Sequence, residues 1–314
     1  MLRCAVLDDY QGVALRLADW SRVRATSFRD HFAGQDELVA AIHDCEIVVA
    51  MRERTPFPAE VLDRLPNLRL LITTGMRNAS IDLDAARARG VTVCGTGSSS
   101  TPPVELTWAL ILGLTRHLLP EATALRTGGP WQSTLGTDLH GRTLGLLGLG
   151  KIGTRMAEIG QAFGMDVVAW SRHLTQERTD ALGVRLAPGK EALLSEADIV
   201  SIHLVLSDRT RGLIGERELS LMRPGAYLVN TSRAGIVDQA ALVAALKAGR
   251  IAGAGLDVFE TEPLPASHEL RTLPNVLATP HLGYVTELNY RTFFRGAVED
   301  IDAFLDGAPI RRLQ

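Results

Sequence analysis

The sequence predicts an α/β protein with two doubly wound parallel-sheet domains. Short apolar runs alternate with segments of helical spacing along most of the 314 residues, which is the pattern of βαβ units and hence of parallel sheets. The length also exceeds what one hydrophobic core usually spans, so two domains are expected. The alternation occurs in two sets, one before residue 100 and one from residue 143.

The expected strands follow from the apolar runs. In the first set they are separated by segments of helical spacing that end in glycine, such as residues 80–90. The first set has expected strands at residues 4–7, 47–51, 70–73 and 91–94. The second set has expected strands at residues 143–147, 167–170, 199–203, 226–230, 253–258 and 276–279.

A serine-rich loop and two prolines separate the sets. Proline in the first turn of a helix loses no hydrogen bond, so a helix starting near Val104 is favoured, and we expect the apolar stretch 104–119 to connect the domains. After His281 the pattern is wholly helical, and we expect its long amphipathic stretch to return to the first domain. We therefore predict one domain from residues 1–100 and 286–314 and an inserted domain from residues 101–285.

Composition and charge exclude several classes of function. A formal net charge of −3 gives no global attraction for nucleic acid or for an acidic membrane. The N-terminus reaches acidic residues too early for a signal peptide, and residues 104–119 are too few to span a bilayer, so we expect a cytoplasmic protein. Cys4, Cys45 and Cys94 lie in or beside apolar segments without short spacing, which predicts buried reduced thiols and no metal site.

One stretch of the second set carries a binding motif. Gly148, Gly150 and Gly153 form G-x-G-x-x-G between an expected strand and an expected helix, with Lys151 and Ile152 in the same turn. This pattern brings backbone N–H groups close to a pyrophosphate at a helix N-terminus. Because strand, turn, helix and second strand follow in order, we expect dinucleotide binding. The alternatives are a packing turn and a site for another adenosine ligand, such as the S-adenosylmethionine of a methyltransferase.

The end of the second strand bears on the choice of cofactor. An acidic residue at this position binds the ribose 2′-hydroxyl of NAD(H), but this sequence has Ser171 and Arg172 there. A guanidinium pairs with a 2′-phosphate, which a carboxylate would repel. We therefore expect NADP(H) to be favoured. The alternative is a solvated Arg172 beside a site that binds NAD(H) without the acid.

Polar residues follow further expected strands, at the edge where parallel sheets bind ligands. In the second set these are His203, Thr231, Ser232, Arg233, the acidic stretch from Asp257 to Glu262, and His281. In the first set they are Arg52 to Arg54 and the stretch from Gly75 through Met76 and Arg77 to Asn78. We expect the first group to line one wall of a cleft and the second group to line the other.

Hydride transfer to a carbonyl is a chemistry that suits such residues. It needs an acid to protonate the developing alkoxide, and histidine is the side chain that titrates nearest neutrality. His281 lies just past a strand and is the best placed of the eight histidines. A carboxylate would orient it, and Asp257, Glu260 and Glu262 are all available, since spacing alone does not choose among them.

The motifs from GLGKIG through NTSRAGIVD and DVFETEP to TPHLG make the chain resemble the NAD(P)-dependent D-2-hydroxyacid dehydrogenases. That family includes phosphoglycerate dehydrogenases and glyoxylate/hydroxypyruvate reductases. The resemblance covers nearly the whole chain and is most specific over residues 140–286. It implies a flavodoxin-like substrate domain made from both chain ends, an inserted Rossmann dinucleotide-binding domain, and a homodimer with an apolar contact near residues 104–119.

The resemblance also implies roles for individual residues. Arg233 would bind the carboxylate and carbonyl oxygen of a small 2-oxo acid, His281 would donate the proton, and Glu262 would hold His281. Asp257 is implied as a contact to the nicotinamide carboxamide. The implied substrates are glyoxylate, hydroxypyruvate or a phosphoglycerate-like acid, and the alternative function is an NAD(H)-sensing, co-repressor-like binding protein.

Two loops depart from the family's pattern. The substrate loop that starts at Gly75 lacks the family's second glycine and carries Arg77, and the stretch from His203 to Ser207 differs from the usual H-x-P-L-T. We therefore expect the surroundings of the substrate carboxylate and of the adenine to differ. No regulatory extension follows residue 314, so feedback control by a dedicated domain is not expected.

Overall fold

The computed structural model describes residues 1–313 and divides the chain into two units. The first comprises Met1–Ser99 and Val285–Gln314, and the second comprises Ser100–Tyr284. Each junction lies within one residue of the predicted one. Among the described residues, none of the helices has the length and apolar content that crossing a lipid bilayer requires.

The first unit contains a five-stranded parallel sheet in the order β2-β1-β3-β4-β5. This is the flavodoxin-like order that the family resemblance implied. The strands are β1 (Arg3–Val6), β2 (Arg24–Ser27), β3 (Ile47–Ala50), β4 (Leu70–Thr73) and β5 (Thr92–Gly95).

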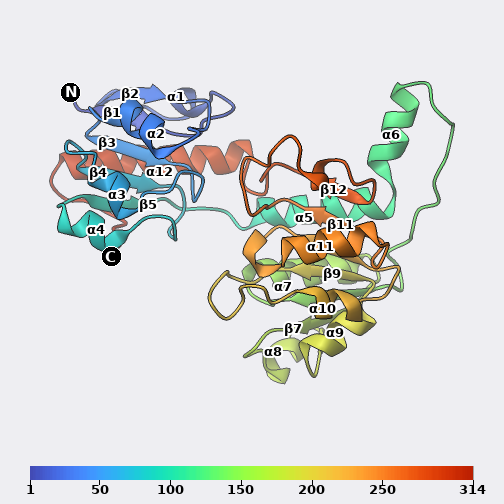
Figure 1. Ribbon diagram of the computed structural model, residues 1–314. Coiled ribbons are helices and arrows are strands. Elements are labelled where there is room, and N and C mark those ends of the chain that lie inside the picture. Colours follow the sequence, from blue (N-terminus) through green and yellow to red (C-terminus); the bar gives the residue numbers. More distant parts are fainter. Residues whose placement is uncertain (314) are drawn as a thin grey trace. The chain divides into compact units, whose positions relative to one another are not determined.

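Helices built from both ends of the chain cover this sheet. They are α1 (Ala14–Leu17), α2 (Gln35–Ile42), α3 (Ala59–Leu62), α4 (Leu83–Ala88) and α12 (Glu287–Leu305). The helices α2, α3 and α4 enclose one apolar cluster, whereas α12 packs on α1, β4 and β5 (Figure 1). The chain end adds to the edge of the sheet, where the N–H of Leu313 donates to the carbonyl oxygen of Val93 at 2.8 Å. The long C-terminal helix therefore returns to the first domain, as expected.

The second unit contains a seven-stranded parallel sheet in the order β12-β11-β10-β9-β6-β7-β8. The chain runs outward from β6 to β8, then starts again at β9 on the other side of β6, which is the Rossmann order. The strands are β6 (Thr143–Leu147), β7 (Asp166–Trp170), β8 (Arg185–Leu186), β9 (Ile199–Ile202), β10 (Tyr227–Asn230), β11 (Gly253–Leu256) and β12 (Val276–Ala278).

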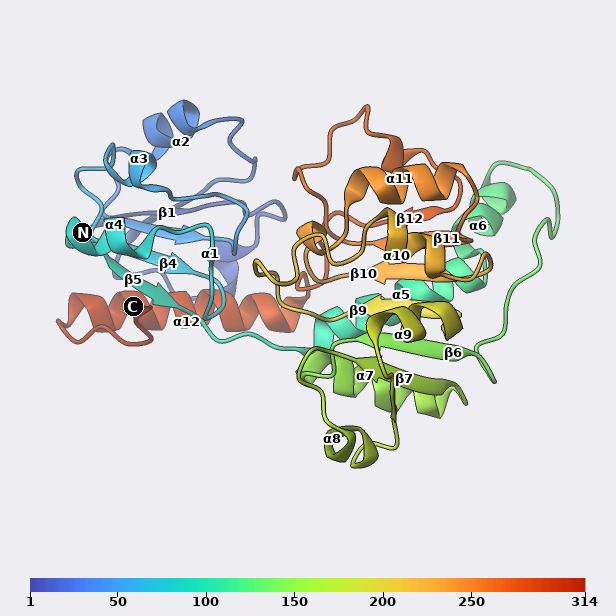
Figure 2. The ribbon, with the colours of Figure 1, turned by 60° about the horizontal axis from the view of Figure 1, so that its bottom comes forward.

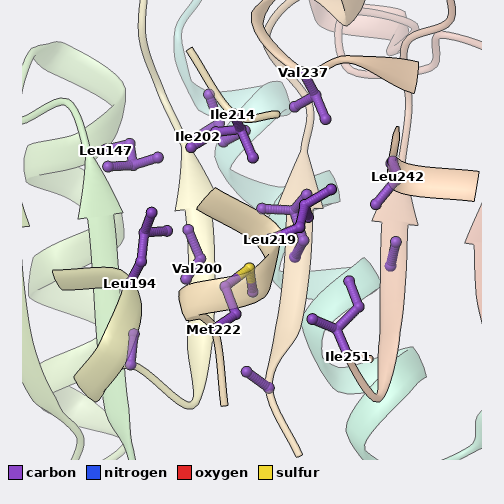
Figure 3. Packing of buried hydrophobic residues seen from close by; sticks show 14 of the residues in the cluster. Leu147, Leu194, Val200, Ile202, Ile214, Leu219, Met222, Val237, Leu242 and Ile251 are labelled. Carbon is purple, nitrogen blue, oxygen red and sulfur yellow. The ribbon is translucent and has the colours of Figure 1, made fainter. Parts of the chain in front are cut away.

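Helices cover both faces of the second sheet (Figure 2). They are α5 (Thr101–Thr115), α6 (Leu118–Arg126), α7 (Lys151–Ala162), α8 (Gln176–Asp180), α9 (Lys190–Glu196), α10 (Glu216–Leu221) and α11 (Gln239–Lys247), with short 3-10 turns at Ala234–Ile236 and Glu269–Arg271. On one face, α9, α10 and α11 bury Leu194, Leu219 and Leu242 against strand residues such as Val200 (Figure 3). On the other face, α5 and α7 enclose a second cluster.

The expected connector helix is two helices. It begins at Thr101, three residues before the predicted start, and its first part ends at Thr115, before His117 adopts a left-handed φ of 50°. Val104, Trp108 and Ile111 are buried within the second unit. The apolar side chains of α5 thus stabilise their own domain and are not available for the expected contact with another copy.

The three cysteines are free thiols, as the sequence predicted. Cys4 and Cys94 are buried, and burial raises the pKa of both thiols. Cys45 differs from the prediction because it is only partly buried.

Candidate active site

The glycine motif forms a tight turn between β6 and α7. Gly148 has a φ of 106°, and an added Cβ would lie 2.5 Å from the carbonyl oxygen of His203. An added Cβ at Gly153 would collide with the backbone of Gly148, so this glycine lets the helix pack on the strand. At Gly150 an added Cβ would meet nothing within 4 Å. Packing within the chain therefore explains two of the glycines, and the third leaves the backbone open to a ligand.

A cavity of about 690 Å³ opens at this turn. It is lined by Gly148 and Gly150, by residues 170–174 after β7, and by parts of the loop after β9. Its volume is typical of small-molecule sites, and it lies where the strand order reverses, the point at which open parallel sheets bind ligands. The predicted residues Ser171, Arg172 and His203 line it, whereas Lys151, Ile152 and Gly153 form the first turn of α7 behind the glycine loop.

The side chain of His203 is half-buried at the edge of this cavity. Its Nε2 lies 2.9 Å from the hydroxyl of Ser201, and its Nδ1 has no hydrogen-bond partner among residues 1–313. Burial lowers the pKa of His203 to about 4, so the ring is neutral near pH 7. His203 is therefore an uncharged group beside the glycine turn, where its backbone carbonyl lies close to Gly148.

The loop after β10 is held by its own polar side chains. The amide of Asn230 donates to the carbonyl oxygen of Arg233 at 3.0 Å and accepts from the N–H of Ser232 at 3.0 Å. The hydroxyl of Ser232 donates to the end of β9 at 2.8 Å, and that of Thr231 lies 2.8 Å from the hydroxyl of Thr107. These contacts fix the backbone from which the half-buried side chain of Arg233 extends.

The loop that carries His281 is organised by Asp257, a fully buried carboxylate after β11. Asp257 accepts from the hydroxyl of Thr279 at 2.6 Å and from the N–H groups of Leu282 and Gly283 at 2.7 and 2.8 Å. Burial raises the pKa of Asp257. Its oxygens hold His281 in a left-handed conformation with a φ of 54°, which an unsupported loop would avoid. The contact to the nicotinamide carboxamide stays a prediction.

His281 and Glu262 form a close pair. Nδ1 of His281 lies 2.6 Å from Oε2 of Glu262, and Oε1 of Glu262 accepts from the N–H of Phe259 at 2.9 Å. The ring of Tyr284 meets His281 edge-on, at 5.3 Å between centroids. Because Nδ1 is engaged, Nε2 is the ring nitrogen that can exchange a proton with another molecule.

The structure distinguishes among Asp257, Glu260 and Glu262, the three possible acidic partners of His281. Glu262 contacts His281, Asp257 holds the surrounding loop, and the side chain of Glu260 is exposed. Sequence reasoning missed the second role, in which Asp257 builds the histidine loop. It also missed Arg209, which lines the cavity and follows β9 as the predicted polar residues follow their strands.

In the first unit, Arg52 and Gly75 lie at the ends of neighbouring strands. Arg52 has a φ of 52°, and its N–H donates to the hydroxyl of Thr74 at 3.0 Å. Gly75 has a φ of 94°, and an added Cβ would lie 2.5 Å from a guanidinium nitrogen of Arg52. The N–H of Gly75 donates to the hydroxyl of Thr96 at 3.0 Å. This N–H is therefore occupied and does not point freely at a ligand.

The next two residues of the loop have backbone N–H groups that are open to a ligand. Within the described chain, the N–H groups of Met76 and Arg77 donate to no acceptor, and both side chains are exposed. The amide of Asn78 braces the loop by donating to the carbonyl oxygen of Arg52 at 2.6 Å and to the hydroxyl of Thr73 at 2.9 Å. The loop thus presents two adjacent backbone donors on a fixed support.

A Rossmann sheet with an open glycine turn, and a Glu–His pair at the carboxyl edge of the same sheet, define a nucleotide-dependent oxidoreductase. Residues 108–283 match the family model described as D-isomer specific 2-hydroxyacid dehydrogenase, NAD binding domain. The chain belongs to this family and is an oxidoreductase that uses a nicotinamide cofactor.

Individual relatives agree with this assignment. The chain is 43% identical over 257 residues to a glyoxylate reductase of Aeropyrum pernix, covering 79% of this chain and 76% of that enzyme. It is 36% identical over 256 residues to a D-3-phosphoglycerate dehydrogenase of Methanocaldococcus jannaschii, covering 81% of this chain but only 48% of that enzyme. A phosphoglycerate oxidoreductase structure from Vibrio cholerae superposes with a TM-score of 0.93 at 38% identity, covering 98% of this chain and 100% of that one.

Proposed function

We propose that this protein reduces a small 2-oxo acid to the D-2-hydroxy acid, with NADP(H) as the favoured cofactor and NAD(H) as the less favoured one. The observation that carries this proposal is the pairing of Glu262 with Nδ1 of His281 at 2.6 Å. The pair lies at the carboxyl edge of the sheet whose glycine turn opens on the cavity.

Residues of this chain bind the substrate and transfer the proton to it. A bound nicotinamide supplies the hydride to the carbonyl carbon of the substrate. Nε2 of His281 gives its proton to the carbonyl oxygen, which would otherwise carry the developing negative charge. Glu262 favours the protonated ring and fixes its orientation. Arg233 pairs with the substrate carboxylate and polarises the carbonyl.

The substrate carboxylate is also a ligand for backbone donors. We assign the N–H groups of Met76 and Arg77 to this role because both lack an acceptor in the described part of the chain. Arg52 supports their loop. Glyoxylate and hydroxypyruvate are the substrates we favour, because the glyoxylate reductase of Aeropyrum pernix is similar to this chain over three quarters of its own length. The substrate class can be identified by testing a panel of 2-oxo acids with NADPH, in which some acids carry a phosphate group and others do not.

The preference for NADP(H) rests on Arg172. Its side chain is exposed, lines the cavity beside Ser171, and has no ion-pair partner among residues 1–313. A charge-assisted contact with a 2′-phosphate contributes about 1.5–3 kcal/mol, or roughly ten- to a hundredfold in affinity. Arg172→Ala should lower kcat/KM with NADPH by that factor and leave NADH nearly unchanged, and Ser171→Asp should reverse the preference. A tenfold preference of the wild-type protein for NADH would refute the assignment.

We further propose that the protein is a homodimer that works in the cytoplasm, whose reducing conditions suit three free thiols. After α5, the chain continues through α6 and an extended segment (Figure 1). Five large apolar side chains of this part are exposed. They are Leu118, Leu119, Leu125, Trp131 and Leu135, with exposed fractions of 56, 57, 66, 79 and 92%. A second copy of the chain would cover them. Leu125→Glu with Trp131→Ser should convert the dimer to a monomer in light scattering, whereas a wild-type monomer would refute the proposal.

A further inference from the structure

The nucleotide cavity has a second arginine that the family motifs do not assign. Arg209 lies in the loop after β9 and lines the same cavity as Arg172, which follows β7. In the sheet, β6 lies between β9 and β7, so the two arginines flank the glycine turn that follows β6. The side chain of Arg209 is exposed and, within residues 1–313, makes no hydrogen bond or ion pair.

The loop that carries Arg209 is a fixed turn. The hydroxyl of Thr210 donates to the carbonyl oxygen of Val205 at 2.7 Å and accepts from the N–H of Ser207 at 2.8 Å. The N–H of Arg211 donates to the carbonyl oxygen of Ser207 at 2.9 Å. The backbone position of Arg209 is therefore set before a ligand arrives, which reduces the entropy lost on binding.

The other charged groups of the cavity wall are already paired. Lys190 donates to Glu218 at 2.9 Å and to the carbonyl oxygen of Leu213 at 2.9 Å, and its side chain is largely buried. Glu191 lies 3.9 Å from Arg217. Arg172 and Arg209 thus remain as the two arginines of the wall without an acidic partner in the described chain, and a phosphate monoester is the ligand chemistry that two guanidinium groups favour.

We propose that Arg209 is a second ligand of the ribose 2′-phosphate and a specificity residue for NADP(H). It binds the phosphate from the β9 side while Arg172 binds it from the β7 side. This inference rests on the proposed preference for NADP(H). That preference was based on the residues directly after β7, whereas Arg209 lies in the loop after β9.

The test measures binding without catalysis, by titrating 2′,5′-ADP and 5′-AMP into the protein in a calorimeter. The variants are Arg209→Ala, Arg172→Ala and the control Arg223→Ala, which removes a positive charge at the amino edge of the same sheet, where Arg223 donates to Asp198. We expect Arg209→Ala and Arg172→Ala each to weaken 2′,5′-ADP by about ten- to a hundredfold and 5′-AMP by less than threefold. The control should change neither.

The outcomes separate this inference from the proposed cofactor preference. If Arg172→Ala weakens only 2′,5′-ADP and Arg209→Ala binds both ligands as the wild-type protein does, the role of Arg209 is overturned and the preference for NADP(H) remains. Equal weakening of both ligands by Arg209→Ala would assign its contact to a group that the two ligands share, such as the adenine or the 5′-phosphate, and also overturn the role. Wild-type protein that binds 2′,5′-ADP no better than 5′-AMP would overturn both. Thermal melts of each variant confirm that the exposed substitutions leave folding unchanged.

Discussion

Replacing Gly150 with alanine should separate cofactor binding from folding. Gly150 is the N-cap of α7, with a φ of −79° and a ψ of −159°, and an added Cβ meets nothing within 4 Å. Alanine at a compatible glycine position stabilises a protein by about 0.4–1 kcal/mol, whereas the poorer N-cap costs less than about 1 kcal/mol. The two effects nearly cancel, so we expect the melting temperature to stay within about 4 °C of wild type.

Cofactor binding should respond very differently. The new methyl group would lie where the backbone approaches the pyrophosphate, and losing one or two charge-assisted hydrogen bonds weakens binding by about ten- to a hundredfold. Titration with NADPH measures the loss. Gly153→Ala is the matched control, because its Cβ collides with the backbone of Gly148 and should lower the melting temperature instead. Wild-type affinity in Gly150→Ala would refute the assignment of the glycine turn to the pyrophosphate.

Three further substitutions have measurable consequences. Glu262→Gln keeps the contact with His281 but removes the charge opposite the ring, so kcat for substrate reduction should fall by about ten- to a hundredfold; an unchanged kcat would make Glu262 purely structural. Burial lowers the pKa of His203 to about 4, so the unfolded chain binds a proton there between about pH 6.5 and 4 while the folded chain does not. The free energy of unfolding, measured in urea at pH 7 and at pH 5, should therefore fall less between the two pH values for His203→Asn than for the wild-type protein. Asp300 is a fully buried residue of α12 whose Oδ1 accepts from Nε of Arg311 at 2.9 Å. Burial raises its pKa to about 7, so the folded carboxyl holds its proton from about pH 4 to 7 while the unfolded one does not, and stability falls as pH rises. The stability of Asp300→Asn relative to wild type should then increase from pH 5 to pH 8, and a constant difference would contradict this.

The buried strands were predictable because strands of a parallel sheet covered on both faces are continuous apolar runs. β3 and β4, with the sequences IVVA and LLIT, are fully buried and match their predicted runs. β2, with the sequence RATS, and the two-residue β8 were missed because both lie at sheet edges, where alternate side chains are exposed and the apolar signal is weak.

The site was predictable as far as strand-end positions allow. Parallel strands end at one edge, which placed His281, Arg233 and the glycine turn on the same side of the sheet. The pairing of His281 with Glu262 needs the path of the loop between them, which no spacing rule gives. Likewise, the sequence did not indicate that Thr96 occupies the N–H of Gly75, because the two residues lie on loops after neighbouring strands.

Proton transfer by His281 can be tested by one kinetic comparison. Wild-type protein and His281→Ala are compared for kcat in the reduction of glyoxylate or hydroxypyruvate with saturating NADPH, alongside the affinity of each for NADPH. We expect kcat to fall by roughly 10²–10⁴-fold while the affinity for NADPH stays within about threefold of wild type. A kcat within about twofold of wild type would remove His281 from the mechanism.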